Sequence, residues 1–317
     1  PSFEIGTLNG FKVIDGPIHG WQEHQSPYIL FVDILKQVKI SDKATIGIDE
    51  SAQFFIFDGI NKVQTGLNLI NAQAITAHCR MQKSDNEIAL MQGAMNMTLA
   101  VHQATASMLY EGISTTEVEA FIKQAHQKVG APGNHFCIVL FGIATSFPHG
   151  VKDAQVLKVG DIVLIDTGCK VHDYLSDITR TYVFGEPTGR QREFWNNEKS
   201  AQLAAFNAAQ IGAPCEAVDA AARDYLASQG LGPEYQTPGC PHRTGHGIGL
   251  DIHEWPYLVG GNKTPLATGM CFSNEPMLVV PDEFGIRLED HFYMTDKGAR
   301  WFTEPSNSID NPFGLSN

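Results

Sequence analysis

Residues 241–254 read PHRTGHGIGLDIHE and place three histidines, His242, His246 and His253, among closely spaced glycines. Glycine lets a backbone take tight, extended or positive-φ conformations that other residues avoid. Glycine at positions 245, 247 and 249 also disfavours a continuous helix. The spacing of His242 and His246 is therefore not that of two zinc ligands on one helical face, and we expect a non-helical segment here.

Four carboxylates complement these histidines. Asp166 and Asp177 lie upstream in IDTGCKVHDYLSD, and Glu275 and Glu289 lie downstream in SNEP and IRLED. One histidine together with four carboxylates is a hard, oxygen-rich set of ligands. Such a set suits two Mn²⁺-like ions that share bridging carboxylates better than a structural zinc bound by thiolates.

The first pair of carboxylates falls on a predicted hairpin. Residues 161–184 indicate two strands about a turn, and a centre between Val171 and His172 sets Asp166 opposite Asp177. Two opposed carboxylates repel each other, and burying them is costly unless a cation binds them. The alternative is a solvated hairpin with surface aspartates, which the apolar run Ile-Val-Leu-Ile before Asp166 disfavours.

The second pair falls on another predicted hairpin. Its strands are Met270–Val280 and Gly285–Tyr293, because Pro-Asp-Glu at 281–283 supplies turn residues between them. A centre near residue 282 sets Glu275 opposite Glu289. The same arrangement of two facing carboxylates is therefore expected twice.

Two helices precede each predicted hairpin. Capping-box signatures at Ser84 and Ser114 open the first two, and residues 190–211 and 216–229 form the second two. The order α-α-β-β thus recurs along the chain. Between the first helices and the first hairpin, an apolar strand leads to His149, which stands between proline and glycine in a reasonable position for an active-site residue.

Length and composition describe an ordinary globular chain. Its 317 residues suffice for two domains, and hydrophobic and charged residues make up 43% and 18%. The net charge of −13 argues against a nucleic-acid or anionic-membrane partner, and no apolar run reaches the length of a membrane span. We expect a cytoplasmic protein. Because the chain begins at Pro1, we expect the N-terminus to be incomplete, and an exported form is the alternative. Six scattered cysteines form no CxxC motif, and their even number leaves disulfides open without favouring them.

With these residues in place, the chain resembles the pita-bread metallopeptidases, the M24 family that includes methionine aminopeptidases, Xaa-Pro aminopeptidases and prolidases. The similarity covers residues 83–317 and implies an α+β pita-bread catalytic domain there. Residues 1–82 resemble the later part of the smaller α/β domain that precedes it in the proline-specific branch, so that domain is expected to be truncated. The resemblance implies five metal ligands and two catalytic histidines. The ligands are Asp166, Asp177, His246, Glu275 and Glu289, with Asp177 and Glu289 bridging, and the histidines are His149 and His253.

Two further residues distinguish the branch. Proline-specific members resemble this chain in having a histidine four positions before the metal-binding histidine, here His242, and an arginine in the position of Arg287. The family resemblance implies two divalent ions per chain, Mn²⁺ first with Co²⁺, Zn²⁺ or Fe²⁺ as alternatives. It also implies a homodimer that acts on proline-containing peptides, with no nucleic-acid or membrane partner.

The expected reaction is hydrolysis of the Xaa-Pro bond of dipeptides, as in prolidase, by a hydroxide that bridges the two ions. Glu275 would take the proton of the attacking water, and His253 and His149 would stabilise the oxyanion and carry a proton to the prolyl nitrogen. His242 and Arg287 would hold the prolyl side, the arginine through the terminal carboxylate, unless His242 only supports the glycine-rich loop. The first alternative is an Xaa-Pro aminopeptidase that acts on longer peptides. A metal-free hydrolase of small molecules and a non-enzymatic binding module share the fold, but the complete ligand set argues against both.

Overall fold

The computed structural model describes residues 1–313 and divides into two compact units, Pro1–Cys79 and the chain from Arg80 onward. The boundary lies three residues before the predicted one. The first unit holds helices and a two-stranded parallel sheet. Its elements are α1 (Ile5–Phe11), α2 (Pro27–Gln37), β1 (Thr45–Ile48), α3 (Phe54–Val63), β2 (Asn68–Asn71) and α4 (Gln73–Arg80), which ends at the boundary.

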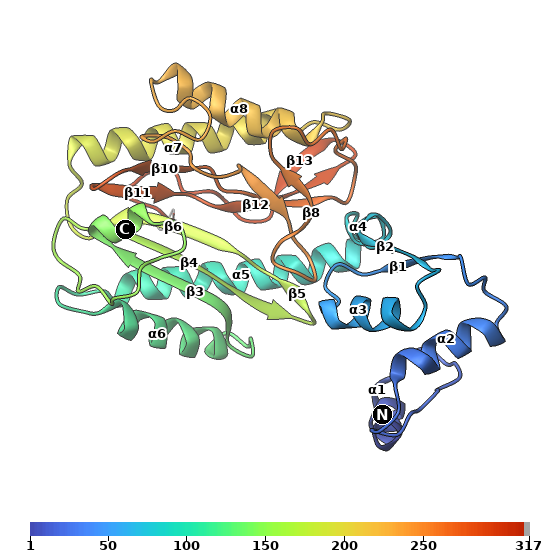
Figure 1. Cartoon of the computed structure of the whole chain (residues 1–317). Helices are drawn as coiled ribbons and strands as arrows, with labels where there is room; N and C mark the ends of the chain where they lie inside the picture. The colour runs from blue at the N-terminus through green and yellow to red at the C-terminus, as the bar shows by residue number, and fades with distance from the viewer. Residues whose placement is uncertain (314–317) are drawn as a thin grey trace. The chain divides into compact units, whose positions relative to one another are not determined.

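The second unit is a layered α+β structure in which the strands lie between two pairs of helices (Figure 1). Helices α5 (Asp85–Met108) and α6 (Thr115–Lys128) cover one side, and α7 (Gly189–Ala208) and α8 (Cys215–Ser228) cover the other. This is the twofold α-α-β-β order expected from the sequence. The strands are β3 (Asn134–Phe141), β4 (Ile162–Val171), β5 (Tyr174–Leu175), β6 (Ile178–Val183), β7 (Gly245–Gly247), β8 (Glu254–Leu258), β9 (Cys271–Asn274), β10 (Met277–Val280), β11 (Phe284–Arg287), β12 (Asp290–Thr295) and β13 (Gly298–Trp301).

Local sequence explains where the first helices begin. At the start of α5 the Ser84 side chain accepts from the backbone of Glu87 while the Glu87 carboxylate accepts from Ser84, and Ser114 and Glu117 repeat this capping box at α6. The buried face of α5 includes Met91, Met95 and His102, and the His102 ring bonds the Ile178 carbonyl. His102 is therefore a packed histidine of the core.

The first hairpin differs from the prediction in register. Strand β4 pairs with β6 so that Asp166 faces Thr179, not Asp177, because the turn is centred one residue later than expected. His172 and Asp173 form that turn with φ of 46° and 68°, the left-handed conformation that a two-residue hairpin of type I′ needs at both positions. When the centre of the turn moves by one residue, the partner of each residue changes by two positions. Asp177 therefore lies diagonal to Asp166, in the break between β5 and β6.

The register of the second hairpin is as predicted. Arg287 pairs with Met277, and Asp290 pairs with Asn274. Both pairs are symmetric about residue 282, so Glu275 and Glu289 face each other in the gap between the two ladders. The histidine-rich stretch is non-helical, as expected, and contributes β7 to a five-stranded sheet of order β13-β12-β9-β7-β8. Within residues 1–313, no helix is both long enough and apolar enough to cross a membrane.

Candidate active site

The five residues expected to be metal ligands converge inside the second unit. Ligand atoms of Asp177, His246 and Glu289 lie within 4.8 Å of one another, and all three residues are buried. The Nε2 atom of His246 lies 3.1 Å from Glu275 Oε1 and 3.7 Å from Asp177 Oδ2. Asp166 lines the same cavity of about 210 Å³ as Asp177, His246 and Glu275.

Thr179 joins the two hairpins at the level of these carboxylates. It is the cross-strand partner of Asp166 and also forms an isolated bridge with Glu289. Its hydroxyl donates to Glu289 Oε2 at 2.6 Å. The residue was not singled out from the sequence, although its position two residues after Asp177 in a predicted strand was the available signal.

Several carboxylate oxygens of the cluster have no donor. Asp166 Oδ1, Asp177 Oδ1 and Glu289 Oε1 are buried without a hydrogen-bond partner among the described residues. A buried acceptor left without a donor is costly, and a buried ionised carboxylate more so. Oxygen ligands in this number, with one imidazole, fit hard divalent cations such as Mn²⁺. The residues present therefore fit the metal ions that the sequence implies.

The electrostatics of the cluster favour the binding of a cation. Burial raises the pKa of Asp177 well above its usual value, and the charge of Glu289 raises it further. Burial also raises the pKa of Glu289, helped by Glu275. For Glu275 burial acts in the same direction, but the hydrogen bond and charge of His246 outweigh it and lower the pKa. A cation held between these groups would favour their ionised forms.

Arg287 supports the cluster from within. Its Nη2 donates to Asp166 Oδ2 at 2.5 Å, its Nε to Thr179 Oγ1 at 3.0 Å and its Nη1 to the Pro148 carbonyl at 3.2 Å. The side chain is buried. Three protein groups therefore hold the guanidinium, and an N–H remains at each terminal nitrogen.

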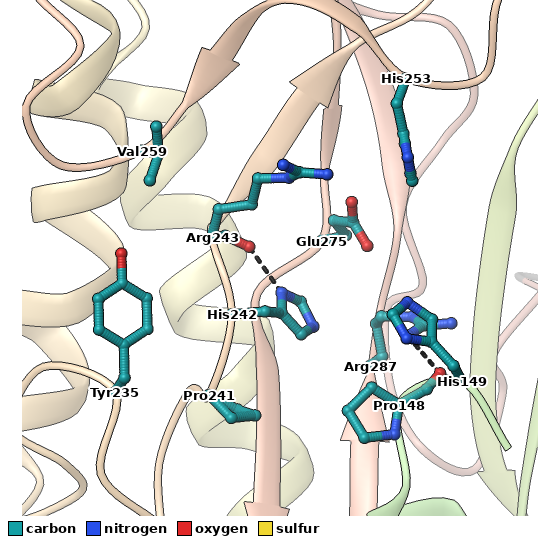
Figure 2. A pocket seen from close by; sticks show the side chains of 10 residues that line it. All are labelled: Pro148, His149, Tyr235, Pro241, His242, Arg243, His253, Val259, Glu275 and Arg287. Carbon is teal, nitrogen blue, oxygen red and sulfur yellow. Dashed lines mark hydrogen bonds between the residues drawn. The ribbon is translucent and has the colours of Figure 1, made fainter. Parts of the chain in front are cut away.

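The larger cavity beside the cluster, about 450 Å³, contains the other residues predicted for the site (Figure 2). His149 and His253 both line it with exposed side chains, and the His253 ring lies 4.2 Å from that of His246. His242 bonds the Arg243 carbonyl through Nδ1 at 2.7 Å, so its Nε2 is left as an acceptor, and it has no partner within residues 1–313. Burial lowers the pKa of His242, which keeps the ring neutral.

A partly buried ionic cluster fixes the loop that carries His253. Lys83 and Arg80 both contact the carboxylate of the next residue, Glu254, with 2.6 Å between Arg80 Nη2 and Glu254 Oε2. Arg80 also pairs with Asp251 at 2.8 Å. These contacts tie both ends of the 251–254 segment to the chain just before α5.

Besides Thr179, two further residues of the site were missed in the sequence. His291 is buried with its ring 6.2 Å from that of His246, and burial lowers its pKa to about 3. It follows Glu289 by two residues, and that period of two along a strand could have indicated it. Arg243 lines the larger cavity, and its place beside His242 was the available signal.

Comparisons with known proteins agree with this geometry. Residues 89–296 match metallopeptidase family M24. The crystal structure of dipeptidase PepE from Mycobacterium ulcerans superposes with a TM-score of 0.88 at 32% identity, covering 97% of this chain and 81% of that one. The structure of a prolidase from Thermococcus sibiricus superposes with a TM-score of 0.85 at 30% identity, covering 96% of this chain and 81% of that one. The structure of an X-Pro aminopeptidase from Thermotoga maritima superposes with a TM-score of 0.83 at 26% identity, covering 97% of this chain and 83% of that one. The pita-bread fold expected from the sequence is thereby confirmed, and the chain belongs to metallopeptidase family M24.

Proposed function

We propose that this metallopeptidase is an Xaa-Pro dipeptidase that works with two divalent ions. One observation carries the proposal: the cavity of the carboxylate cluster and the larger cavity share His149, His253, Glu275 and Arg287. A substrate in the larger cavity therefore meets the cluster directly. The similarity to structures named dipeptidase and prolidase supports this class of substrate.

The metal ligands would be the five converging residues. Asp177 and Glu289 would bridge the two ions, since each contributes a buried oxygen without a donor and both belong to the tightest group of ligand atoms. Mn²⁺ is the ion we expect first. When bound, two such ions supply a water of lowered pKa and polarise the carbonyl of the substrate. The remaining ligands are Asp166, His246 and Glu275.

The chain's own residues would then move protons and stabilise charge. Glu275 would accept the proton of the attacking water. The prolyl nitrogen carries no hydrogen and must gain one as it leaves, and the exposed imidazoles of His149 and His253 would help to carry it. Their N–H groups would also stabilise the developing oxyanion. His242 would contact the prolyl side through its free Nε2.

A substrate panel tests the specificity. Metal-loaded protein would be assayed on alanyl-proline, alanyl-alanine and alanyl-prolyl-alanine under identical conditions. We expect alanyl-proline to have the highest kcat/KM. Faster cleavage of the tripeptide would establish an Xaa-Pro aminopeptidase instead, and faster cleavage of alanyl-alanine would establish a general dipeptidase.

We also propose a role for residues 1–82 and a location. Residues 1–82 would be part of the smaller α/β domain of the proline-specific branch, with a packing or lid function. The protein would act in the cytoplasm, which fractionation of cells that express it would test.

A further inference from the structure

Arg243 differs from most other arginines of the chain. It is partly buried and lines the larger cavity, where its guanidinium extends toward Glu275 and His253 (Figure 2). Within residues 1–313 that guanidinium has no hydrogen bond and no ion pair. The arginines that do pair with a carboxylate are Arg80, Arg180, Arg190, Arg192, Arg223 and Arg287.

An aromatic ring holds this guanidinium in place. The Arg243 Cζ atom lies 4.3 Å from the centroid of the Tyr257 ring. Tyr257 is itself fixed on β8, where it pairs with His246 across the sheet. A guanidinium stacked on a ring keeps its N–H groups in its own plane, so they stay free to bind an anion.

The position of Arg243 suits the terminal carboxylate of a dipeptide. In a dipeptide the carboxylate belongs to the residue directly after the cleaved bond, and neighbouring Cα atoms are about 3.8 Å apart. Its partner must therefore share a cavity with the reacting groups, as Arg243 does with Glu275 and His253. A longer peptide would present an uncharged amide at this point. Arg287, in contrast, is already bonded to Asp166, Thr179 and Pro148.

We propose that Arg243, stacked on Tyr257, binds the C-terminal carboxylate of the substrate and restricts the enzyme to dipeptides. The inference rests on the proposed function and adds to it a residue that selects substrate length. A planar, forked cation matches a carboxylate in two parallel hydrogen bonds, which a lysine cannot reproduce.

The test compares an acid with its amide. Alanyl-proline and alanyl-prolinamide differ only in the group that Arg243 would bind. In R243M the ratio of kcat/KM for the acid to that for the amide should fall roughly 10- to 100-fold, the loss expected for a charge-assisted hydrogen bond. R243K should give an intermediate ratio. Tyr257→Leu should lower the ratio and Tyr257→Phe should not, because only the first removes the ring face.

Arg300 offers a matched control. It is an exposed arginine over the ring of Tyr293, with 6.0 Å between its Cζ and the centroid, and it does not line the larger cavity. R300M should leave the ratio at the wild-type value. A ratio that is unchanged in R243M, or that falls equally in R300M, would overturn the proposal.

A binding measurement separates this inference from the proposed function. Calorimetry on metal-free protein measures binding without turnover. It should show that R243M weakens the binding of alanyl-proline but hardly changes the binding of alanyl-prolinamide. If wild-type protein fails to cleave Xaa-Pro dipeptides, the proposed function falls. The role of Arg243 is then tested separately, by comparing how R243M changes the binding of the acid and of the amide of whichever dipeptide the panel favours. Equal weakening of acid and amide would show that Arg243 only shapes the pocket.

Discussion

Arg287 and Asp166 form a buried ion pair beside the candidate metal ligands. The arginine was expected to hold the substrate carboxylate. Because it is already bonded to Asp166, Thr179 and Pro148, we propose that it supports the cluster instead. We predict that R287M lowers kcat/KM on alanyl-proline and alanyl-prolinamide by similar factors. Removing one partner of a buried pair should also destabilise the metal-free protein by about 3–5 kcal/mol.

Urea unfolding of metal-free R287M and wild-type protein would measure that loss. R287K keeps the charge and serves as the control, because it should recover part of the stability but not the three fixed hydrogen bonds. If R287M lowered kcat/KM on alanyl-proline but not on alanyl-prolinamide, Arg287 and not Arg243 would be the residue that binds the carboxylate.

At the scale of single residues, the sequence identified the candidate site through residue type. Histidines and carboxylates stand out as ligands, so His246 and Glu289 could be recognised without a structure. Arg243 could not, because its significance lies in an absence: no carboxylate of the described chain pairs with it. Whether a charged side chain is paired depends on contacts between distant segments, which spacing along the chain does not reveal.

Among the elements, the close approach of β7 and β9 depends on Gly245. A Cβ at this position would lie 2.1 Å from the Ser273 carbonyl oxygen, so the strands would have to separate. The Ser273 hydroxyl accepts from the His246 backbone and donates to Glu275. We predict that Gly245→Ala destabilises the protein by about 1–3 kcal/mol, as overpacking does, and weakens divalent-ion binding.

Gly93→Ala is the matched control for this substitution. Gly93 lies inside α5, and beyond the backbone of its own helix no atom lies within 4 Å of the position of a Cβ, so alanine should stabilise the protein by about 0.5–1 kcal/mol. Thermal unfolding and calorimetric metal titration would compare the two variants. Unchanged metal affinity in Gly245→Ala would show that the spacing of β7 and β9 does not position His246.

The two hairpins show how far a strand pattern predicts register. Proline and acidic residues marked the second turn, and the predicted facing of Glu275 and Glu289 was right. The first turn contains no glycine or proline that would mark its position. His172 and Asp173 adopt the left-handed conformation there instead. Because the predicted centre was one residue too early, the predicted partner of Asp166 was Asp177, whereas the observed partner is Thr179. Asp166 and Asp177 still line one cavity, because diagonal neighbours on a sheet remain close.

For the whole molecule we predict a homodimer in solution. The resemblance to the proline-specific branch implies this assembly. Light scattering across a wide range of protein concentration would measure the mass. We expect twice the chain mass of 34.7 kDa, and a concentration-independent monomer would contradict the prediction.

The central claim is that two divalent ions in the carboxylate cluster carry out the peptidase reaction. The most direct measurement is the activity of chelated protein on alanyl-proline as Mn²⁺ is added back, with bound metal counted in the same samples. We predict no activity without metal, and full activity when two ions per chain are bound. Asp177→Ala should bind fewer ions and stay inactive, since Asp177 is expected to bridge. Full activity in protein shown to be metal-free would contradict the account.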